Sequence, residues 1–454
     1  MADAGASEGK FDLVVIGGGS SGLATCKEAG RLGARVALVE MAELGGTCVN
    51  RGCVPKKLLW KAAKTVQQAD DMVGLGLLST APVFDLAAHQ RHVSAKLASI
   101  HDSFEAQLAD AGVTLLRGRA SVGTDGTVSV DGQTLGTRRV VLATGAAPIM
   151  LDIDGADLMC DSSDVLSWEH VPARIAIIGA GYIGCEFASI FTALGAKVSI
   201  VNDTPNLLDG FDRDAVTVVE TVFERRGIER FMEREPASIS RAGDDLVLTL
   251  DDGHTIVCDA VVCAVGRAPK LDGLGPIGGV LKTTEKGFVA IDDCFRTSIA
   301  GVHAVGDLVD RMPLTPVAVR DGRTLARLLY APEADPQRLD LGHAATAAFT
   351  IPPMAQVGRV RDGDADPQGC RVASGHVAPI QSGVLLPEDQ GEDANFHKLL
   401  TDEDRIVGAA LVSDDAPDTI AGLAAMVAGG VTTEAVHDPA AIHPSFAEEF
   451  IGSN

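Results

Sequence analysis

The sequence predicts an α/β protein with two similar βαβ domains, followed by a third domain with a different pattern. Two segments about 160 residues apart each place a short apolar strand before a glycine-rich turn and a helix. Beyond about residue 339 this pattern stops, and short strands accompany one alanine-rich stretch at 420–428. The chain of 454 residues is also too long for one hydrophobic core, because domains usually hold roughly 50–200 residues.

The first βαβ segment runs from an apolar strand at 11–16 to Glu40. A G-x-G-x-x-G turn at 17–22, a helical stretch through Leu32 and a strand at 35–39 lie between them. Such a turn holds a dinucleotide pyrophosphate at the helix N-terminus, and an acidic residue after the second strand accepts hydrogen bonds from a ribose. The candidate dinucleotide-binding residues are therefore Gly17, Gly19, Ser20, Gly22 and Glu40.

The second segment repeats this design with a strand at 174–178, a turn at 179–184, a helix to Leu194 and a strand at 197–201. The candidate binding residues of its turn are Gly179, Gly181 and Gly184. One such turn is weak evidence, whereas two in βαβ context indicate two dinucleotides in one chain. Tight glycine turns that bind nothing are the alternative interpretation.

Between these units we expect hairpins at 127–133 and 246–253. Two further apolar strands, at 140–143 and 260–265, end in Thr144-Gly145 and Gly266-Arg267. Glycine at those ends lets the backbone approach a ligand closely.

Cys48 and Cys53 stand five residues apart, directly after the first βαβ unit, and predict a redox-active disulfide. In a straight helix their Cα atoms would be ~8.7 Å apart, beyond the ~7 Å limit of a disulfide, so we expect irregular chain between them. Gly52 permits that distortion, and Pro55 suits the first turn of a following helix. A zinc half-site and a static bridge are the alternatives. The other cysteines are expected to be buried or half-buried apolar residues: Cys26, Cys160, Cys185, Cys258, Cys263, Cys294 and Cys370.

Charge and composition exclude several classes of partner. The net charge of −24 argues against nucleic acid and anionic membrane, which both need a basic face. An anionic substrate would need local cations. The polar start at 1–10 has no apolar signal region and no run of 18 apolar residues follows, so we expect a cytoplasmic protein. No metal site is expected.

The chain resembles the pyridine nucleotide-disulfide oxidoreductases, and specifically their glutathione-reductase-like branch. Besides the two glycine turns and the cysteine pair, the resemblance rests on 143–145, 265–269, 304–307, 314–318, Pro55-Lys56-Lys57 and the terminal motif at 443–449. It implies an FAD domain at 1–150, an NAD(P) domain at 151–268, a segment at 269–338 that returns to the FAD domain, and a dimerisation domain at 339–454. The expected fold is therefore two Rossmann-like domains plus an α+β interface domain.

This resemblance assigns roles to named residues. FAD would bind the first fold, with its pyrophosphate near Gly19 and its ribityl chain near Asp307. Reduced nicotinamide nucleotide would bind the second fold after Tyr182 swings aside. Further implied cofactor-binding residues are Thr47, Thr144, Gly145 and Arg267.

Catalytic roles follow from the same resemblance. Lys56 would pair with Glu186 beside the flavin, although a solvated helix charge is the simpler interpretation of Lys56. Cys53 would be the thiolate nearest the flavin and Cys48 the interchange thiol. His443 would protonate the leaving thiol, with its tautomer fixed by Glu448; a surface histidine is the alternative. In the family this histidine comes from the partner subunit, so we expect a homodimer.

Two departures from the branch bear on specificity. NADPH-dependent relatives carry arginines in the stretch that corresponds to 201–209. Here that stretch has no Arg or Lys and instead contains Asn202, Asp203 and Asp209. Carboxylates repel a 2′-phosphate, while Asn202 or Asp203 can accept bonds from a free ribose hydroxyl, so we expect NADH to be favoured over NADPH.

The resemblance implies a small thiol disulfide as the substrate, with Lys27 and Arg323 at the cationic positions that hold it in the family and Phe104 and His101 nearby. The segments 375–382 and 387–393 differ from glutathione reductases, so a disulfide other than that of glutathione remains open. Two further alternatives are a dihydrolipoamide dehydrogenase-like enzyme and a redox-sensing flavoprotein.

Overall fold

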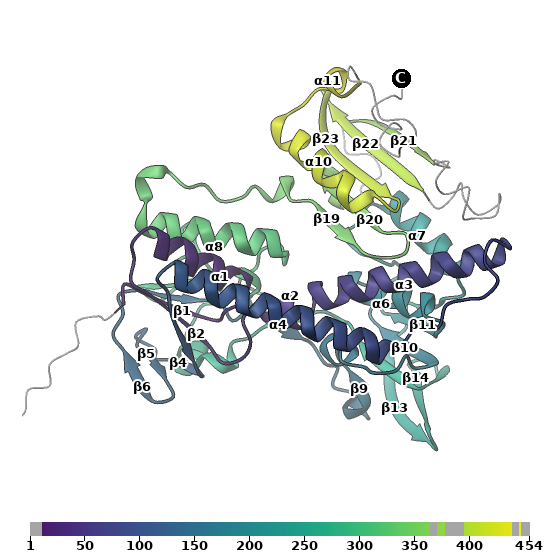
Figure 1. The fold of residues 1–454 in the computed structure, drawn as a ribbon, viewed down its shortest axis with the longest axis horizontal. Helices are drawn as coiled ribbons and strands as arrows, with labels where there is room; N and C mark the ends of the chain where they lie inside the picture. Colours follow the sequence, from purple (N-terminus) through teal and green to yellow (C-terminus); the bar gives the residue numbers. More distant parts are fainter. Residues whose placement is uncertain (1–10, 363–369, 377–394, 438–444, 446–454) are drawn as a thin grey trace, which may run out of the picture. The chain divides into compact units, whose positions relative to one another are not determined.

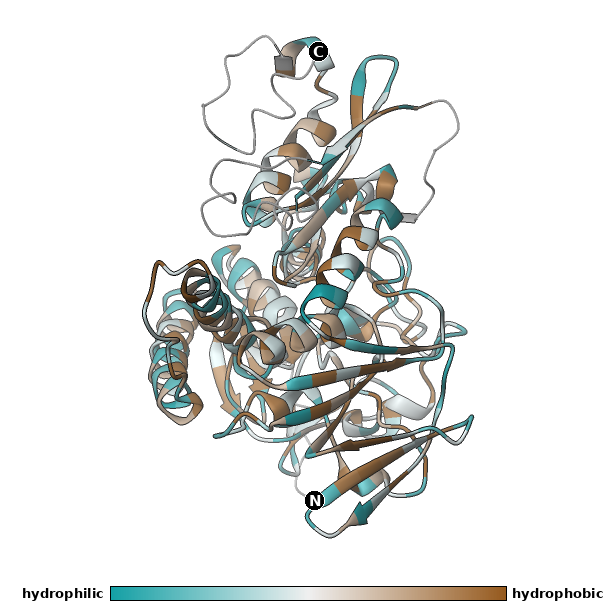
Figure 2. Ribbon diagram, turned by 90° about the vertical axis from the view of Figure 1, so that its right-hand side faces the viewer, coloured by the Kyte–Doolittle hydropathy of each residue, from teal (hydrophilic) through white to brown (hydrophobic). Residues whose placement is uncertain are grey.

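The computed structural model describes residues 11–362, 370–376, 395–437 and 445. The chain divides into two compact units, each made of three segments (Figure 1). The first unit contains 1–55, 91–148 and 267–339, and the second contains 56–90, 149–266 and 340–454. Hydrophobic residues follow the strands, while the helices alternate hydrophobic and hydrophilic positions (Figure 2).

The first unit is built on a parallel five-stranded sheet, in the order β18-β7-β1-β2-β3. Its strands are β1 (Leu13–Ile16), β2 (Val36–Glu40), β3 (Thr114–Arg117), β7 (Val140–Leu142) and β18 (Val302–Ala304). Helices α1 (Ser20–Arg31) and α8 (Thr315–Tyr330) pack against each other. The strand β18 shows that the segment after residue 267 completes this sheet.

Smaller elements surround this sheet. An antiparallel sheet holds β4 (Ala120–Val122), β5 (Val128–Val130) and β6 (Gln133–Leu135), which confirms the first expected hairpin. The strands β8 (Ala146–Pro148) and β17 (Arg267–Pro269) pair antiparallel. The helices of this part of the chain are α2 (Gly46–Asn50), α3 (Cys53–Gly74) and α4 (Leu86–Asp110), and the last two each contribute residues to both units.

The second unit repeats the parallel design in the order β12-β11-β10-β16-β9. Its elements are β9 (Met159–Cys160), α5 (Ser162–Val165), β10 (Arg174–Ile178), α6 (Tyr182–Ala193), β11 (Lys197–Asn202), α7 (Arg213–Arg225), β12 (Glu229–Met232) and β16 (Ala260–Cys263). The antiparallel strands β13 (Pro236–Ala242), β14 (Asp245–Leu250) and β15 (Thr255–Cys258) confirm the second hairpin.

A third, antiparallel sheet completes the second unit in the order β19-β20-β23-β22-β21. Its strands are β19 (Thr346–Ala348), β20 (Met354–Gly358), β21 (Arg371–His376), β22 (Phe396–Asp402) and β23 (Arg405–Val412). Helix α10 (Ala416–Gly429) packs on β20 and β23, and α11 (Thr433–His437) follows. The predicted fold class, with two parallel βαβ folds and an α+β C-terminal part, is confirmed.

The residues expected to form the first domain, 1–150, contribute to both units. Segment 56–90 belongs to the second unit because α3 buries Leu59, Trp60 and Ala63 in its core. An N-terminal helix thus supplies apolar surface to a sheet formed more than 100 residues later. The seven scattered cysteines are free and buried or half-buried, as predicted.

A buried charge cluster joins the third sheet to α7. The side chain of Lys398 is 1% exposed, and its Nζ lies 2.8 Å from Oδ2 of Asp212, which is 0% exposed. Asp214 lies 2.9 Å from the same nitrogen. Asp212 also accepts the N–H of Ala215 and so caps α7, while its own N–H donates to Gln356. Each member of the cluster therefore has a partner, as buried charge requires.

We predict that Lys398→Met lowers the free energy of unfolding by about 3–5 kcal/mol, because it leaves the Asp212 carboxylate buried without its cation. Urea unfolding followed by circular dichroism measures this loss. The matched control is Lys197→Met, whose pair with Glu229 is 68% and 48% exposed and should contribute less than about 1 kcal/mol. Equal midpoints for the two variants would contradict the prediction.

Candidate active site

The first and third glycines of each turn pack the following helix tightly on its strand. A β-carbon on Gly22 would strike the carbonyl oxygen of Gly17, and one on Gly184 would strike that of Gly179. Gly17 and Gly179 have φ angles of +104° and +106°, which side chains other than hydrogen rarely adopt. The two turns therefore share the same backbone conformation, and residues larger than glycine at these positions would disrupt it.

The second glycine of each turn instead faces open space. The nearest atom to a β-carbon on Gly19 would be Gly46 Cα at 3.8 Å, and around Gly181 nothing described lies within 4 Å. Helices α1 and α6 begin directly after these residues, and no described side chain caps either N-terminus. Both helix starts thus have room beside the second glycine and no described side-chain cap, which fits the pyrophosphate of one dinucleotide at each.

The second strand of each fold ends in a side chain that binds the glycine turn. Glu40 accepts hydrogen bonds from the N–H of Gly18 at 2.6 Å and of Ala42 at 2.8 Å. In the second fold Asn202 takes the same place and accepts the N–H of Ala180 at 2.9 Å. The two folds thus differ at this position by a full negative charge.

The loop after Asn202 carries no cation. The hydroxyl of Thr204 donates to Asp209 Oδ2 at 3.1 Å, and Asp203 is exposed. The first basic residue after the strand, Arg213, lies 3.3 Å from Glu220 on its own helix.

Four other expected cofactor-binding residues lie at or near the paired strands β8 and β17. Arg267 donates to the carbonyl of Ala146 at 2.6 Å, and Thr144 donates to that of Lys270 at 3.1 Å. Gly145 has a φ of +70°. Burial raises the pKa of Asp307, and the charge of Arg267 opposes that rise.

The cysteine pair lies where two helices meet at a break. Helix α2 ends at Asn50, Arg51 has a φ of −146°, and α3 begins at Cys53, so the chain between the cysteines is irregular as predicted. Both are thiols in the structure. A hydrogen bond with Cys53, followed by burial, raises the pKa of Cys48, while hydrogen bonds with Thr315 and Ser20 lower it. The thiols are therefore neighbours, and Thr47, another expected cofactor-binding residue, precedes Cys48 in α2.

Lys56 forms the ion pair that the resemblance implies. Its Nζ lies 2.8 Å from Glu186 Oε1, and the two side chains are only 13% and 4% exposed, so a solvated helix charge is wrong. The N–H of Phe349 donates to the same oxygen at 2.8 Å, and the Phe349 ring lies 4.2 Å from the ammonium group. The Glu186 carboxylate is thus buried, the Lys56 ammonium group is half-buried, and each has a partner of opposite charge.

Sequence reasoning missed the neighbouring Lys57. Its ammonium group lies 3.8 Å from the ring centre of Trp60 and 3.5 Å from that of Phe349. Burial, followed by the charge of Lys56, lowers the pKa of Lys57 to about 8. The doubled lysine and the nearby tryptophan were visible in the sequence, but Phe349 comes from a distant strand end.

Three of the four expected substrate residues lie together. Lys27 of α1 donates to Gln107 of α4 at 2.7 Å and lies 5.5 Å from the Phe104 ring. Burial, Arg31 and Arg323 lower the pKa of Lys27 in that order, so Arg323 of α8 is close enough to act on it. His101, the fourth residue, contacts Asn50 in the segment between Cys48 and Cys53 instead.

Comparisons with known proteins identify the family. Residues 11–322 match the model described as pyridine nucleotide-disulphide oxidoreductase, and residues 344–453 match the dimerisation domain of that family. The chain belongs to the pyridine nucleotide-disulphide oxidoreductases. Within this family it is glutathione-reductase-like.

Three glutathione reductases are among its relatives in this family. That of Burkholderia cepacia is 34% identical and covers 97% of this chain and 98% of its own. That of Nostoc sp. is 32% identical, and the match covers 97% of this chain and 98% of the relative. That of Pisum sativum is 31% identical, and the match covers 97% of this chain and 82% of the relative. The structure resembles a Cu(II) complex of the HOCl-induced flavoprotein disulfide reductase RclA from Escherichia coli, in which one cysteine is replaced by serine. The TM-score is 0.86 at 23% sequence identity, and the match covers 97% of this chain and 98% of that chain, which supports the fold.

Some expectations for this oxidoreductase remain untested by its structure. His443 and Glu448 lie outside the described residues. The described residues hold no group of three or more metal-ligating side chains, and none of their helices is long and apolar enough to cross a membrane.

We predict that Gly19→Val reduces the FAD content of the purified protein at least about tenfold, because its side chain fills the free space at the start of α1. The melting temperature of the apoprotein should stay nearly unchanged, since the site has room. Gly184→Val is the contrasting variant: its β-carbon meets the Gly179 carbonyl, so the protein should melt at a lower temperature. Flavin absorbance and calorimetry measure both effects, and full flavin content in Gly19→Val would contradict the prediction.

Proposed function

We propose that this oxidoreductase is a flavin-dependent reductase of a small thiol disulfide, and that NADH is its favoured electron donor. The observation that carries the proposal is the pair of neighbouring thiols, Cys48 and Cys53, in a chain with two open helix N-termini. The glutathione reductase relatives, 31–34% identical, support the reaction class. No described feature favours a lipoyl-binding component or a redox sensor over this activity.

FAD, bound in the first fold, would accept two electrons from reduced nicotinamide and pass them to the cysteine pair. This chain would hold its pyrophosphate at the start of α1 and its adenosine ribose near Glu40. Lys56 would place a positive charge beside the ring, and Glu186 offsets the cost of burying that charge. Tyr182, which is 40% exposed at the start of α6, would move to admit the nicotinamide.

The two cysteines would carry out the exchange with substrate. The Cys48 thiolate attacks one substrate sulfur, forms a mixed disulfide and releases the first thiol, which takes a proton from His443. The Cys53 thiolate then attacks the Cys48 sulfur and restores the Cys48–Cys53 disulfide, and the second substrate sulfur leaves as a thiolate that takes the proton given up by Cys53. Two electrons leave the protein for each substrate disulfide broken.

Lys27 and Arg323 suit an anionic disulfide, since they bring two cations together on a strongly acidic chain. Phe104 offers an apolar wall beside Lys27. We propose a homodimer formed through the dimerisation domain, with His443 acting across the interface as the resemblance implies.

The decisive experiment measures oxidation of NADH and NADPH by the FAD-loaded enzyme against oxidised glutathione, glutathione amide disulfide, bis-γ-glutamylcystine, lipoamide and oxidised heterocyclic thiols. We predict turnover of at least one small thiol disulfide and a fall of at least about 1,000-fold in Cys48→Ser, which has lost the attacking sulfur. Cys294→Ser, at a half-buried cysteine outside the redox loop, is the matched control and should keep full activity. Preference for lipoamide, or equal activity in Cys48→Ser, would contradict the proposal.

We predict that kcat/KM is at least about tenfold higher with NADH than with NADPH. Replacing both Asp203 and Asp209 with arginine should shift this ratio toward NADPH by at least about tenfold, because charge repulsion becomes a charge-assisted hydrogen bond. Asp244→Arg, at an exposed turn between β13 and β14, controls for net charge and should leave the ratio unchanged. A native enzyme that prefers NADPH would rule out the NADH assignment.

A further inference from the structure

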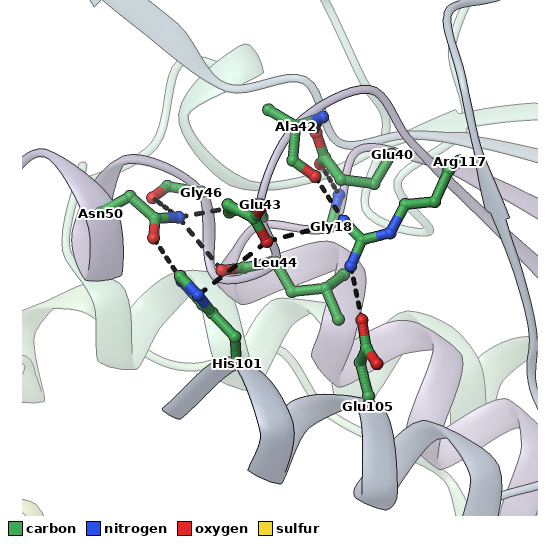
Figure 3. A network of polar contacts seen from close by, with 10 residues as sticks. All are labelled: Gly18, Glu40, Ala42, Glu43, Leu44, Gly46, Asn50, His101, Glu105 and Arg117. Carbon is green, nitrogen blue, oxygen red and sulfur yellow. Dashed lines mark hydrogen bonds and ion pairs between the residues drawn. The ribbon is translucent and has the colours of Figure 1, made fainter. Parts of the chain in front are cut away.

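Asn50 lies between the two redox cysteines and holds the start of α2 together. Its side-chain nitrogen donates to the carbonyl oxygens of Gly46 at 3.0 Å, Leu44 at 3.1 Å and Glu43 at 3.4 Å (Figure 3). Three acceptors on one side require the NH₂ group there, so the amide orientation is determined and Oδ1 points the other way. The Asn50 side chain, two positions after Cys48, thereby holds the backbone of residues 43–46, which precede Cys48.

His101 of α4 contacts the oxygen of this amide, on the side opposite to its nitrogen. Its Nε2 lies 2.6 Å from Asn50 Oδ1, and because that oxygen can only accept, Nε2 must carry a proton (Figure 3). The other ring nitrogen, Nδ1, lies 3.9 Å from the carboxylate of Glu43. The imidazole is 19% exposed, so little water is available to replace its hydrogen bond.

Helix α4 also contacts the loop between Glu40 and Gly46 indirectly, through Arg117. Arg117 of β3 donates to the carbonyl of Ala42 and to Glu105 of α4, one turn beyond His101 (Figure 3). The loop between Glu40 and Gly46 is therefore held both near its start and, through Asn50, at its end. Within this network His101 is the side chain of α4 that reaches the segment between the two cysteines.

We propose that His101 is a positioning residue for the redox pair: through Asn50 it holds the Cys48 segment in the geometry in which the Cys48–Cys53 disulfide closes. The inference rests on the proposed redox role of the two cysteines and gives His101 a task other than contact with substrate. A disulfide requires the two sulfur atoms at about 2 Å, a narrower condition than two neighbouring thiols must meet. A held loop loses less conformational freedom on closure, so the disulfide forms more readily.

The test measures closure itself, without nicotinamide or substrate. The FAD-loaded protein is equilibrated with mixtures of reduced and oxidised dithiothreitol, quenched with N-ethylmaleimide and analysed by mass spectrometry of the two cysteines. Closure transfers two electrons and two protons from the thiols to oxidised dithiothreitol, which becomes the dithiol. We predict that His101→Leu lowers the equilibrium constant for closure about threefold to tenfold, the effect of losing one hydrogen bond.

Two further histidine variants separate positioning from general damage. The Nε2 of glutamine is as many bonds from Cβ as the imidazole Nε2, so His101→Gln should restore closure to within about twofold of the native protein. The nitrogen of asparagine is one bond shorter, so His101→Asn should remain defective. His92→Leu, at an exposed histidine on the same helix, is the matched control and should close normally.

A double-mutant cycle with Asn50→Ala shows whether His101 acts through the amide. In the Asn50→Ala background, His101→Leu should have little further effect, because its partner has already gone. The inference is overturned if His101→Leu closes like the native protein, if glutamine fails to rescue, or if the two single effects simply add.

Steady-state kinetics distinguish the other role for this histidine. If His101 holds substrate, His101→Leu raises KM for the disulfide and leaves closure unchanged, which would refute positioning while the enzyme remains a disulfide reductase. If the proposed function itself fails and no small disulfide is turned over, the closure equilibrium still reports on His101.

Discussion

The two-residue break between α2 and α3 is the constraint on which the arrangement of Cys48 and Cys53 depends. A continuous helix would hold Cys48 and Cys53 too far apart for a disulfide, so the chain must leave helical geometry and return to it within two residues. Gly52 makes this possible, since a β-carbon there would lie only 2.9 Å from the carbonyl oxygen of Thr47. The short helix before this break is braced by the Asn50 side chain, which donates from the last residue of α2 to the carbonyl oxygen of its first residue, Gly46.

The two βαβ folds show how one backbone design serves two cofactors. Both use the first and third glycines for packing and leave the second one open, so the proposed pyrophosphate sites would depend on the backbone. In the proposed function, discrimination between the cofactors would then fall to the side chain that ends the second strand. In the first fold Glu40 brings a full negative charge to the glycine turn, whereas Asn202 offers the same acceptor without that charge. The loop after Asn202 adds the carboxylates of Asp203 and Asp209 and no cation, and the proposed preference for NADH rests on this charge pattern.

The sequence predicted those features that are local in the chain. The glycine turns, the strands beside them and the irregular cysteine segment each follow from residues within one βαβ unit. Contacts between distant residues could not be read in the same way: His101 is 51 residues from Asn50, and Lys398 is 186 residues from Asp212. His101 was accordingly grouped with Phe104, its neighbour in sequence, although the side chains contact different partners. The Lys56–Glu186 pair spans 130 residues and was anticipated only through family resemblance.

The start of α3 concentrates positive charge on an otherwise acidic chain. The protein carries a net charge of −24, yet Lys56 and Lys57 are adjacent at the start of α3. Among the residues that the structure describes, Lys56 has a carboxylate at bonding distance, whereas Asp418 and Glu186 act on Lys57 only at longer range. Lys57 is stabilised instead by the faces of Trp60 and Phe349, which favour a cation without neutralising it. A second carboxylate would cancel the positive field of this pair of lysines, whereas aromatic rings leave it intact. The helix that begins with Cys53 therefore keeps a net positive first turn, which favours developing negative charge close to it.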